Sequence, residues 1–160
     1  MSVGMKIDIG CGRNKQVGFV GIDIAPDVGA DIVCDATQGL PLEDNSVSEV
    51  CMSHTLEHLH DLRGFLRELM RVCKPGATLF FRVPDVQHES YHMPTHCQPW
   101  SRYWWANFCD PYFEVVSITE VPDQEAIAVA RKYLPGITEA DAMLLFWNCR
   151  KELHVTCRAR

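Results

Sequence analysis

Near its beginning the chain reads KIDIGCGRNK over residues 6–15 and GFVGID over residues 18–23. These stretches form an apolar segment, a turn with two glycines one residue apart, and a second apolar segment that ends in Asp23. A Gly-x-Gly turn brings bare backbone close to a ligand, because Cβ atoms would fill that space or forbid the dihedral angles of the turn. A carboxylate at the end of the next strand can accept both hydroxyl hydrogens of a ribose. The stretch therefore predicts a nucleoside cofactor lying across the first two strands of an α/β sheet.

The composition is that of one globular domain. The chain has 160 residues and a formal net charge of −6, and its basic residues are scattered. This disfavours a nucleic-acid partner, because phosphate neutralisation supplies much of that affinity. No apolar run reaches the roughly 20 residues of a membrane span, and the first residues lack the pattern of a secretory signal. We expect a cytoplasmic protein whose partner is a small molecule, a glycan or a protein, and homo-oligomers are compatible with this composition.

The eight cysteines are spread along the chain without any C-x-x-C pair. Several of them interrupt apolar runs, where a thiol packs as a small hydrophobic side chain. We therefore expect reduced, structural cysteines and neither disulfides nor a zinc–thiolate site, and this pattern suits a reducing compartment.

Hydrophobic patterning alternates between strands and connections along most of the chain. Strands are predicted at residues 6–9, 18–23, 30–35, 47–53, 77–83, 113–121 and 152–160. Helices are predicted at residues 61–74, 101–110, 123–134 and 138–151. The run from Ala77 to Val83 is almost entirely apolar, which predicts a strand buried on both faces. The order predicts a single α/β domain over residues 1–160, with a doubly wound Rossmann-like sheet that is mostly parallel and has an antiparallel last strand.

Ligands of such sheets bind at the carboxyl ends of the strands, near the switch in strand order. Three acidic residues stand at or just beyond the ends of the first three predicted strands, namely Asp8, Asp23 and Asp35. Ser53-His54 follows the fourth strand and Pro84-Asp85 follows the fifth. We expect these residues to meet at one edge of the sheet, where each acid could instead serve only to cap its own turn.

The spacing of the first turn argues against a phosphate-bearing cofactor. A dinucleotide fingerprint needs a third glycine that opens a helix and an acid about 20 residues later. Here Lys15 occupies the place of that glycine, and Asp23 follows Gly10 by only 13 residues. The connection is therefore a loop or a single helical turn, without the helix N-terminus on which a pyrophosphate sits. S-adenosylmethionine carries no phosphate, and its ammonium and ribose hydroxyls suit a set of acids at strand ends.

Six motifs in order resemble those of class I S-adenosylmethionine-dependent methyltransferases of the type 11 kind. They are DIGCG at 8–12, GID at 21–23, DIVCD at 31–35, LPLEDNS at 40–46, HTLEHL at 54–59 and RVCKPGA at 71–77. The run GCGRNK resembles a branch with a shortened first helix. The resemblance implies an enzyme that moves a methyl group from S-adenosylmethionine to an oxygen or nitrogen acceptor on a small molecule, glycan or protein, with S-adenosylhomocysteine as product.

The resemblance also implies which residues hold the cofactor. They are Asp8, Gly10, Cys11, Gly12, Asp23, Ile24, Asp35, Ala36, Ser53 and His54. The first four would lie at the methionine part, the next two at the ribose, the following two at the adenine and the last two beside the sulfonium. The short first connection leaves Asn14 and Lys15 without a clear role at the methionine carboxylate.

An oxygen or nitrogen acceptor can require a base to remove its proton. The candidate catalytic residues are His54, His58 and His96. Structural packing at the end of the fourth strand is the alternative for His58 and its neighbour Glu57.

Histidine spacing suggests two further candidate metal sites, and neither is favoured. His54 and His58 lie four residues apart, but Glu57 does not occupy the position of an H-E-x-x-H motif. The histidines at 88, 92 and 96 also repeat every four residues, but Pro94 interrupts a helix there. We therefore expect no metal ion.

The segment 84–112 is rich in proline and aromatic residues and is expected to be an insertion on the acceptor side. Its aromatic residues suit either a hydrophobic cover over the sheet or a wall of the acceptor pocket. Two other functions stay open: a catalytically inactive cofactor-binding or interaction module with the methyltransferase fold, and an NAD-dependent oxidoreductase.

Overall fold

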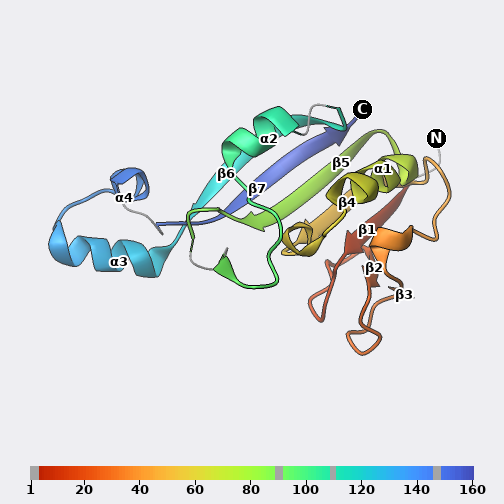
Figure 1. Cartoon of the computed structure of the whole chain (residues 1–160), viewed down its shortest axis with the longest axis horizontal. Helices are drawn as coiled ribbons and strands as arrows, with labels where there is room; N and C mark the ends of the chain where they lie inside the picture. The colour runs from red at the N-terminus through yellow and green to blue at the C-terminus, as the bar shows by residue number, and fades with distance from the viewer. Residues whose placement is uncertain (1–3, 89–91, 109–110, 146–148) are drawn as a thin grey trace.

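The computed structural model describes residues 4–88, 92–108, 111–145 and 149–160. Its strands form one seven-stranded sheet in the order β3-β2-β1-β4-β5-β7-β6 (Figure 1). The strands are β1 Met5–Ile9, β2 Val20–Asp23, β3 Ile32–Val33, β4 Val47–Ser53, β5 Cys73–Pro84, β6 Phe113–Pro122 and β7 Arg150–Ala159. The helices are α1 Leu62–Val72, α2 Arg102–Phe108, α3 Gln124–Tyr133 and α4 Glu139–Leu145, with short 3-10 helices η1 Ala36–Gln38 and η2 Leu56–His58.

The pairing of the strands confirms the predicted fold class. Strands β1 to β5 pair in parallel, whereas β7 runs antiparallel between β5 and β6. Strand β1 pairs with β2 on one side and with β4 on the other. The strand order therefore reverses between β1 and β4, and the carboxyl ends of the strands open a crevice at that point.

The first connection follows the prediction, since residues 10–19 form turns without a helix. The third strand is shorter than predicted, with Ile32 and Val33 in place of residues 30–35. The carboxylate of Asp31, which was assigned to that strand, instead accepts hydrogen bonds from Lys15 Nζ and from the Gly21 backbone.

Two helices end earlier than the sequence indicates. The described part of helix α4 runs to Leu145, and Arg150 and Lys151, which were predicted to be helical, belong to β7 instead. Helix α2 covers Arg102–Phe108, and the predicted residues 109–110 lie outside the described part of the chain. Helix α1 already ends at Val72, so that Pro75 and Gly76 belong to β5 rather than to its helix terminus.

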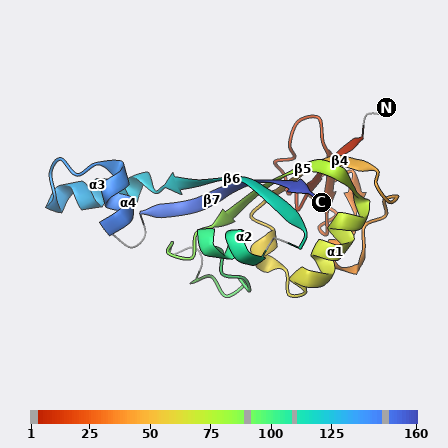
Figure 2. The same cartoon turned by 90° about the horizontal axis from the view of Figure 1, so that it is seen from above.

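Helix α1 is positioned by its cap and by its apolar face. Asp61 accepts a hydrogen bond from the Gly64 backbone at 2.9 Å, which satisfies one of the free N–H groups of the first turn. Its buried face consists of Leu62, Phe65, Leu66, Leu69 and Val72. Figure 2 shows α1 and α2 on the same side of the sheet. Trp105 of α2 stacks on Phe81 of β5 with 5.2 Å between the ring centroids, so this part of the aromatic segment covers the sheet.

The other face of the sheet carries no described helix. In β5, Leu79, Phe81 and Val83 are buried whereas Phe80 is 42% exposed. The predicted burial of this strand on both faces is therefore wrong. The almost continuous apolar run concealed an alternating pattern, since Phe80 lies on the face that α1 and α2 do not cover.

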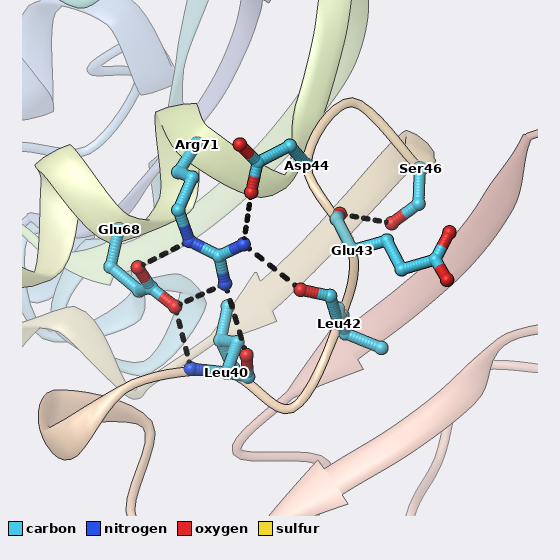
Figure 3. A network of polar contacts seen from close by, with 7 residues as sticks. All are labelled: Leu40, Leu42, Glu43, Asp44, Ser46, Glu68 and Arg71. Carbon is cyan, nitrogen blue, oxygen red and sulfur yellow. Dashed lines mark hydrogen bonds and ion pairs between the residues drawn. The ribbon is translucent and has the colours of Figure 1, made fainter.

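A polar network fixes the loop that links η1 to β4 (Figure 3). The Arg71 guanidinium makes two hydrogen bonds with Glu68, at 2.8 and 2.7 Å, and it donates to the backbone oxygens of Leu40 and Leu42. Arg71 also pairs with Asp44. The bidentate Arg71 contact lowers the pKa of Glu68 to about 2. Because this loop directly follows η1, the network also restrains the segment that carries Asp35.

The C-terminal half extends away from β1–β3. Figure 1 shows α3 and α4 at the far end of the β6–β7 hairpin. These helices enclose a small separate core of Ile127, Ala142 and Cys149.

All cysteines in the described residues are free thiols, and burial raises the pKa of the Cys73 and Cys157 thiols to about 12. These two thiols are structural, in agreement with the sequence analysis.

Candidate functional site

A pocket of about 840 Å³ opens at the carboxyl ends of the central strands. Its lining comes from the β1 turn, the ends of β2 and β3, η1, and the segment after β4. The lining residues are Ile9, Gly10, Ile22, Asp23, Ile24, Cys34, Asp35, Ala36, Thr37, Gln38, His54, Thr55, His58, Leu59, His60 and Asp61. The size is within the usual range for a small-molecule site, and the position is the switch point of the sheet.

The two glycines of the first turn have different structural roles. Gly10 and Gly12 both have positive φ angles, of 70° and 49°, which favour glycine. A Cβ atom on Gly10 would lie 2.2 Å from Oγ1 of Thr55, whereas a Cβ on Gly12 would meet nothing within 4 Å. Gly10 is thus required by its contact with Thr55 as well as by its φ angle. Gly12 is required by its φ angle alone.

Asp23 is held in one orientation at the pocket wall. Its Oδ2 accepts a hydrogen bond from the Gly12 backbone at 2.9 Å, and its Oδ1 accepts one from Ala25 at 2.9 Å. A carboxylate offers about four lone-pair sites, so two backbone bonds leave capacity for the two hydroxyls of a ribose. The backbone bonds also link the first turn to the end of β2.

Asp35 caps η1 and also lines the pocket. Its Oδ1 accepts hydrogen bonds from the backbone and the hydroxyl of Thr37, at 2.9 and 2.6 Å. These bonds hold the pKa of Asp35 below its usual range. Capping and cofactor binding were alternatives for this residue in the sequence, and the geometry is compatible with both.

Four of the predicted cofactor residues do not line the pocket, namely Asp8, Cys11, Gly12 and Ser53. Asp8 is 5% exposed and accepts a hydrogen bond from the Gln16 backbone at 2.7 Å. Burial raises its pKa above the usual range. Its carboxylate thus anchors the loop after the first turn. Lys15 of the same loop pairs with Asp31 at 2.8 Å.

His54 lies between two carboxylates. Its Nε2 is 2.8 Å from Glu152 Oε2, and its Nδ1 is 3.3 Å from Glu57 Oε1. The hydrogen bond with Glu152 and the contact with Glu57 raise the pKa of His54 to about 9. The imidazole is therefore protonated at neutral pH, which disfavours His54 as a base, and its catalytic role stays a prediction.

His58 and His96 meet although 38 positions separate them in the sequence. Their ring centroids are 4.8 Å apart with the rings edge to face. His58 lines the pocket, and through this contact the segment 84–112 reaches the pocket wall. His88 instead pairs with Asp123 at 2.9 Å. The four-residue repeat of histidines in the sequence therefore does not bring His88 and His96 to one site.

The same segment forms a second, shallow pocket on its outer side. This pocket has a volume of about 370 Å³ and is lined by Val86, Pro99, Ser101, Tyr103, Trp104 and Asn107. Trp100 and Trp105 are instead fully buried over the sheet. Trp100 and Trp105 therefore fit the predicted cover over the sheet, whereas an aromatic wall of the acceptor pocket stays a prediction.

Sequence reasoning missed two contributors to the site. Thr55 packs against Gly10 and follows directly after His54, so the HTLEHL motif contained a signal for it. Glu152, which fixes the charge of His54, comes from β7, 98 residues further along the chain. No local motif indicates that pairing, because only the antiparallel β5–β7 register brings the two together.

Residues 7–81 match the model of a family described as "Methyltransferase domain". Demethylmenaquinone methyltransferase of Corynebacterium efficiens is 50% identical over 40 residues, which are 25% of this chain and 17% of that protein. The same enzyme of Corynebacterium glutamicum is 46% identical over 48 residues, or 30% of this chain and 20% of that protein. The chain therefore spans a fifth or less of the length of these curated relatives.

Solved structures resemble the whole chain. A SAM-dependent methyltransferase from Archaeoglobus fulgidus has a TM-score of 0.68 at 18% identity, covering 98% of this chain and 86% of that chain. A complex between the Haloferax volcanii Trm112 methyltransferase activator and a putative methyltransferase contains a chain with a TM-score of 0.68 at 20% identity, with coverage of 99% and 84%. Geranyl diphosphate C-methyltransferase from Streptomyces coelicolor reaches 0.66 at 16% identity, with coverage of 99% and 74%.

The predicted resemblance to class I methyltransferases is confirmed by the family match over residues 7–81 and by the fold that these neighbours share with the chain. The cofactor prediction is confirmed at the level of the family, which binds S-adenosylmethionine. The branch with a shortened first helix stays a prediction. Among the described helices, none has both the length and the apolar character needed to cross a bilayer.

Proposed function

We propose, on the premise that this chain is a class I methyltransferase, that it transfers the methyl group of S-adenosylmethionine to an oxygen or nitrogen of an acceptor. The observation that carries this proposal is the single 840 Å³ pocket that gathers Gly10, Asp23 and Asp35 from successive strands. We assign Gly10 to the methionine part of the cofactor, Asp23 to its ribose and Asp35 to its adenine. The acceptor is a small molecule, a glycan or a protein.

The residues present fit this cofactor. The carboxylate of Asp23 has two lone-pair sites beyond its bonds to Gly12 and Ala25, which suit the ribose diol. Ala36 and Thr37 provide a small apolar wall beside Asp35 for the adenine. When bound, the cofactor supplies an activated methyl group on a sulfonium.

The chain itself then has to align the acceptor with that methyl group. Proximity and orientation alone contribute roughly 7 to 11 kcal/mol to such a displacement. A hydroxyl or ammonium acceptor must also lose a proton, for which His58 and His96 are the remaining candidates because His54 is already protonated. We assign the acceptor side to the segment 84–112, since His96 belongs to it and lies against His58.

We do not transfer the acceptor of the demethylmenaquinone methyltransferases to this chain, because the identity covers 40 to 48 residues. These residues are 17 to 20% of the length of those enzymes. A protein activator, as in the Haloferax volcanii complex, is a further possible partner for the acceptor side.

The test is the formation of S-adenosylhomocysteine in the presence of S-adenosylmethionine and panels of glycans, metabolites and peptides. Mass spectrometry would follow both products, and Asp23→Ala would be the matched control with a weakened cofactor site. We expect acceptor-dependent turnover that Asp23→Ala lowers at limiting cofactor. Binding of S-adenosylmethionine without turnover above the Asp23→Ala level would instead identify an inactive cofactor-binding module. Stabilisation by NAD alone would favour an oxidoreductase.

A further inference from the structure

Glu57 is a buried carboxylate with unmet hydrogen-bonding capacity. Its side chain is 0% exposed, and neither oxygen has a hydrogen-bond partner among the described residues. Oε1 faces His54 Nδ1 at 3.3 Å, but His54 is held more closely by Glu152 at 2.8 Å. A buried carboxylate without hydrogen bonds is costly unless a cation compensates it. Glu57 therefore calls for a second positive partner.

Two histidines stand beside this carboxylate. Glu57, His58 and His96 each offer one ligand atom, and these atoms all lie within 4.8 Å of one another. Two imidazoles and one carboxylate are a ligand set of known catalytic zinc sites, which have three protein ligands and one open position. We propose that Glu57, His58 and His96 bind a Zn²⁺ ion at the wall of the cofactor pocket.

The ring of His58 is already oriented for this role. Its Nδ1 lies 3.1 Å from the carbonyl oxygen of Thr95. A carbonyl oxygen only accepts, so Nδ1 must carry the hydrogen, and the neutral ring presents its lone pair on Nε2. Zinc-bound histidines typically donate their second ring N–H to a carbonyl or carboxylate in this way, which fixes the tautomer.

The segment that carries His96 is fastened to η2 at several points. The Cys97 backbone donates to the carbonyl oxygen of Glu57 at 2.7 Å, and Gln98 Nε2 donates to Leu59 O at 3.0 Å. Together with the His58–Thr95 contact, these bonds hold residues 95–98 against the segment that carries the other two ligands. The three ligands thus come from two segments that the fold joins.

The distances require only a small adjustment. Ligand atoms around a tetrahedral zinc ion lie about 3.4 Å apart, as metal–nitrogen distances near 2.0–2.1 Å imply. The three ligand atoms, now within 4.8 Å of one another, must therefore approach by up to about 1.4 Å. His58 is exposed and His96 is only partly buried, so their rings have room to move.

His58 lines the pocket, so a zinc ion held by this residue would be within reach of an acceptor in the pocket. An acceptor hydroxyl that takes the open position on the ion would lose its proton more easily, as metal-bound water does. The acceptor oxygen would then form a bond to the methyl carbon while the carbon–sulfur bond breaks. Neutral S-adenosylhomocysteine and the methyl ether result, and the proton leaves to water. This role rests on the proposed methyl transfer, whereas the zinc site itself does not.

The site can be tested by zinc titration of the chelator-treated, dialysed chain in competition with a chromophoric chelator. We expect one Zn²⁺ per chain, and at least tenfold weaker binding in His58→Ala, His96→Ala and the isosteric Glu57→Gln. Replacement by Co²⁺ should give the visible absorption of a low-coordinate site in the wild type and lose it in these variants. Circular dichroism checks folding; because His58 is exposed, His58→Ala remains informative if the buried Glu57→Gln variant misfolds.

Neighbouring residues provide matched controls. Cys97 Sγ lies 3.4 Å from His60 Nδ1, so His60→Ala and Cys97→Ser test whether zinc chooses that pair instead. Both variants should keep zinc affinity within about twofold. Loss of zinc in these two with retention in His58→Ala, or equal affinity in all variants, would overturn the proposal. Asp23→Ala should keep zinc while its cofactor affinity falls, so that failure of the zinc site is distinguishable from failure of the proposed function.

Discussion

Removing the carboxylate of Asp23 tests the candidate cofactor site most directly. The side chain accepts two backbone hydrogen bonds at 2.9 Å, from Gly12 and Ala25, and lines the pocket. In Asp23→Ala the ribose would lose its charged acceptor, and a hydrogen bond to a charged group contributes roughly 1.5 to 3 kcal/mol. We expect the affinity for S-adenosylhomocysteine to fall by about 10- to 150-fold.

The same change should also lower stability modestly. The two freed N–H groups are near the surface and can bind water, so we expect the free energy of unfolding to fall by about 1 to 2 kcal/mol. For a chain of this length that corresponds to a melting temperature lower by roughly 2–8 °C. The variant stays folded in this range, and its affinity can be measured by calorimetry.

Asp27→Ala is the matched control. It removes the same charge nearby in the chain, but the Asp27 side chain is 74% exposed with Arg13 at 3.6 Å, and it does not line the pocket. We expect its affinity for S-adenosylhomocysteine to stay within about twofold of the wild type. Unchanged affinity in a folded Asp23→Ala, or an equal loss in Asp27→Ala, would refute the assignment of Asp23 to the ribose.

Three further changes test the packing and electrostatics around the site. The pKa of Glu68 in the folded chain is lowered to about 2. The ionised carboxylate therefore stabilises the fold above about pH 4.5, and this stabilisation is lost as the pH falls towards 2. In urea denaturation between pH 6 and pH 3, the free energy of unfolding of the wild type should fall by about 1 to 2 kcal/mol more than that of Glu68→Gln, after allowance for solvent screening. Parallel pH dependences in the two proteins would contradict this. Gly10→Ala should destabilise by about 2 to 4 kcal/mol through its φ angle and its contact with Thr55, against about 1 kcal/mol for Gly12→Ala, and chemical denaturation that ranks them the other way would contradict the turn geometry. Trp105→Phe should lower the free energy of unfolding by less than about 1.5 kcal/mol, because the indole Nε1 has no hydrogen-bond partner among the described residues. Trp105→Ala should lower it by about 3 to 5 kcal/mol. Similar losses for the two variants in thermal denaturation would show that the Nε1–H matters.

Local signals predicted the central strands and helix α1 well. Strand β4 has the predicted bounds, and helix α1 begins at Leu62, one residue after its predicted start. Both elements have a clear hydrophobic period, and the residues at their ends are unambiguous start and stop signals. The same local reasoning placed Gly10, Asp23 and Asp35 at neighbouring strand ends, because parallel strands end at one edge.

Local signals failed to predict secondary structure and burial where these depend on a strand that is distant in the sequence. The helix predicted to run through residue 151 does not include Arg150 and Lys151, because these residues belong to β7, which pairs with both β5 and β6. The almost continuous apolar run of β5 likewise gave no sign that Phe80 lies on a face without helices. Helix propensity and apolar content describe a segment, whereas pairing and cover depend on what other segments do.

The histidines show the same division. The spacing of the histidines in the sequence suggested metal sites within single stretches, at 54–58 and at 88–96, and neither was favoured. The group that the fold assembles takes Glu57 and His58 from one stretch and His96 from the other.

The sequence alone therefore determined three features. They are a glycine turn without phosphate-binding features, an acid at the end of the second strand that suits a ribose, and motifs that resemble those of a methyltransferase. These features are local, because backbone conformation and strand ends depend on a few adjacent residues. The tertiary structure alone decided the charge of His54, through Glu152 of β7, and the meeting of His58 with His96. Proton affinity and ligand geometry depend on groups within a few ångströms, and here those groups are 98 and 38 positions apart in the chain.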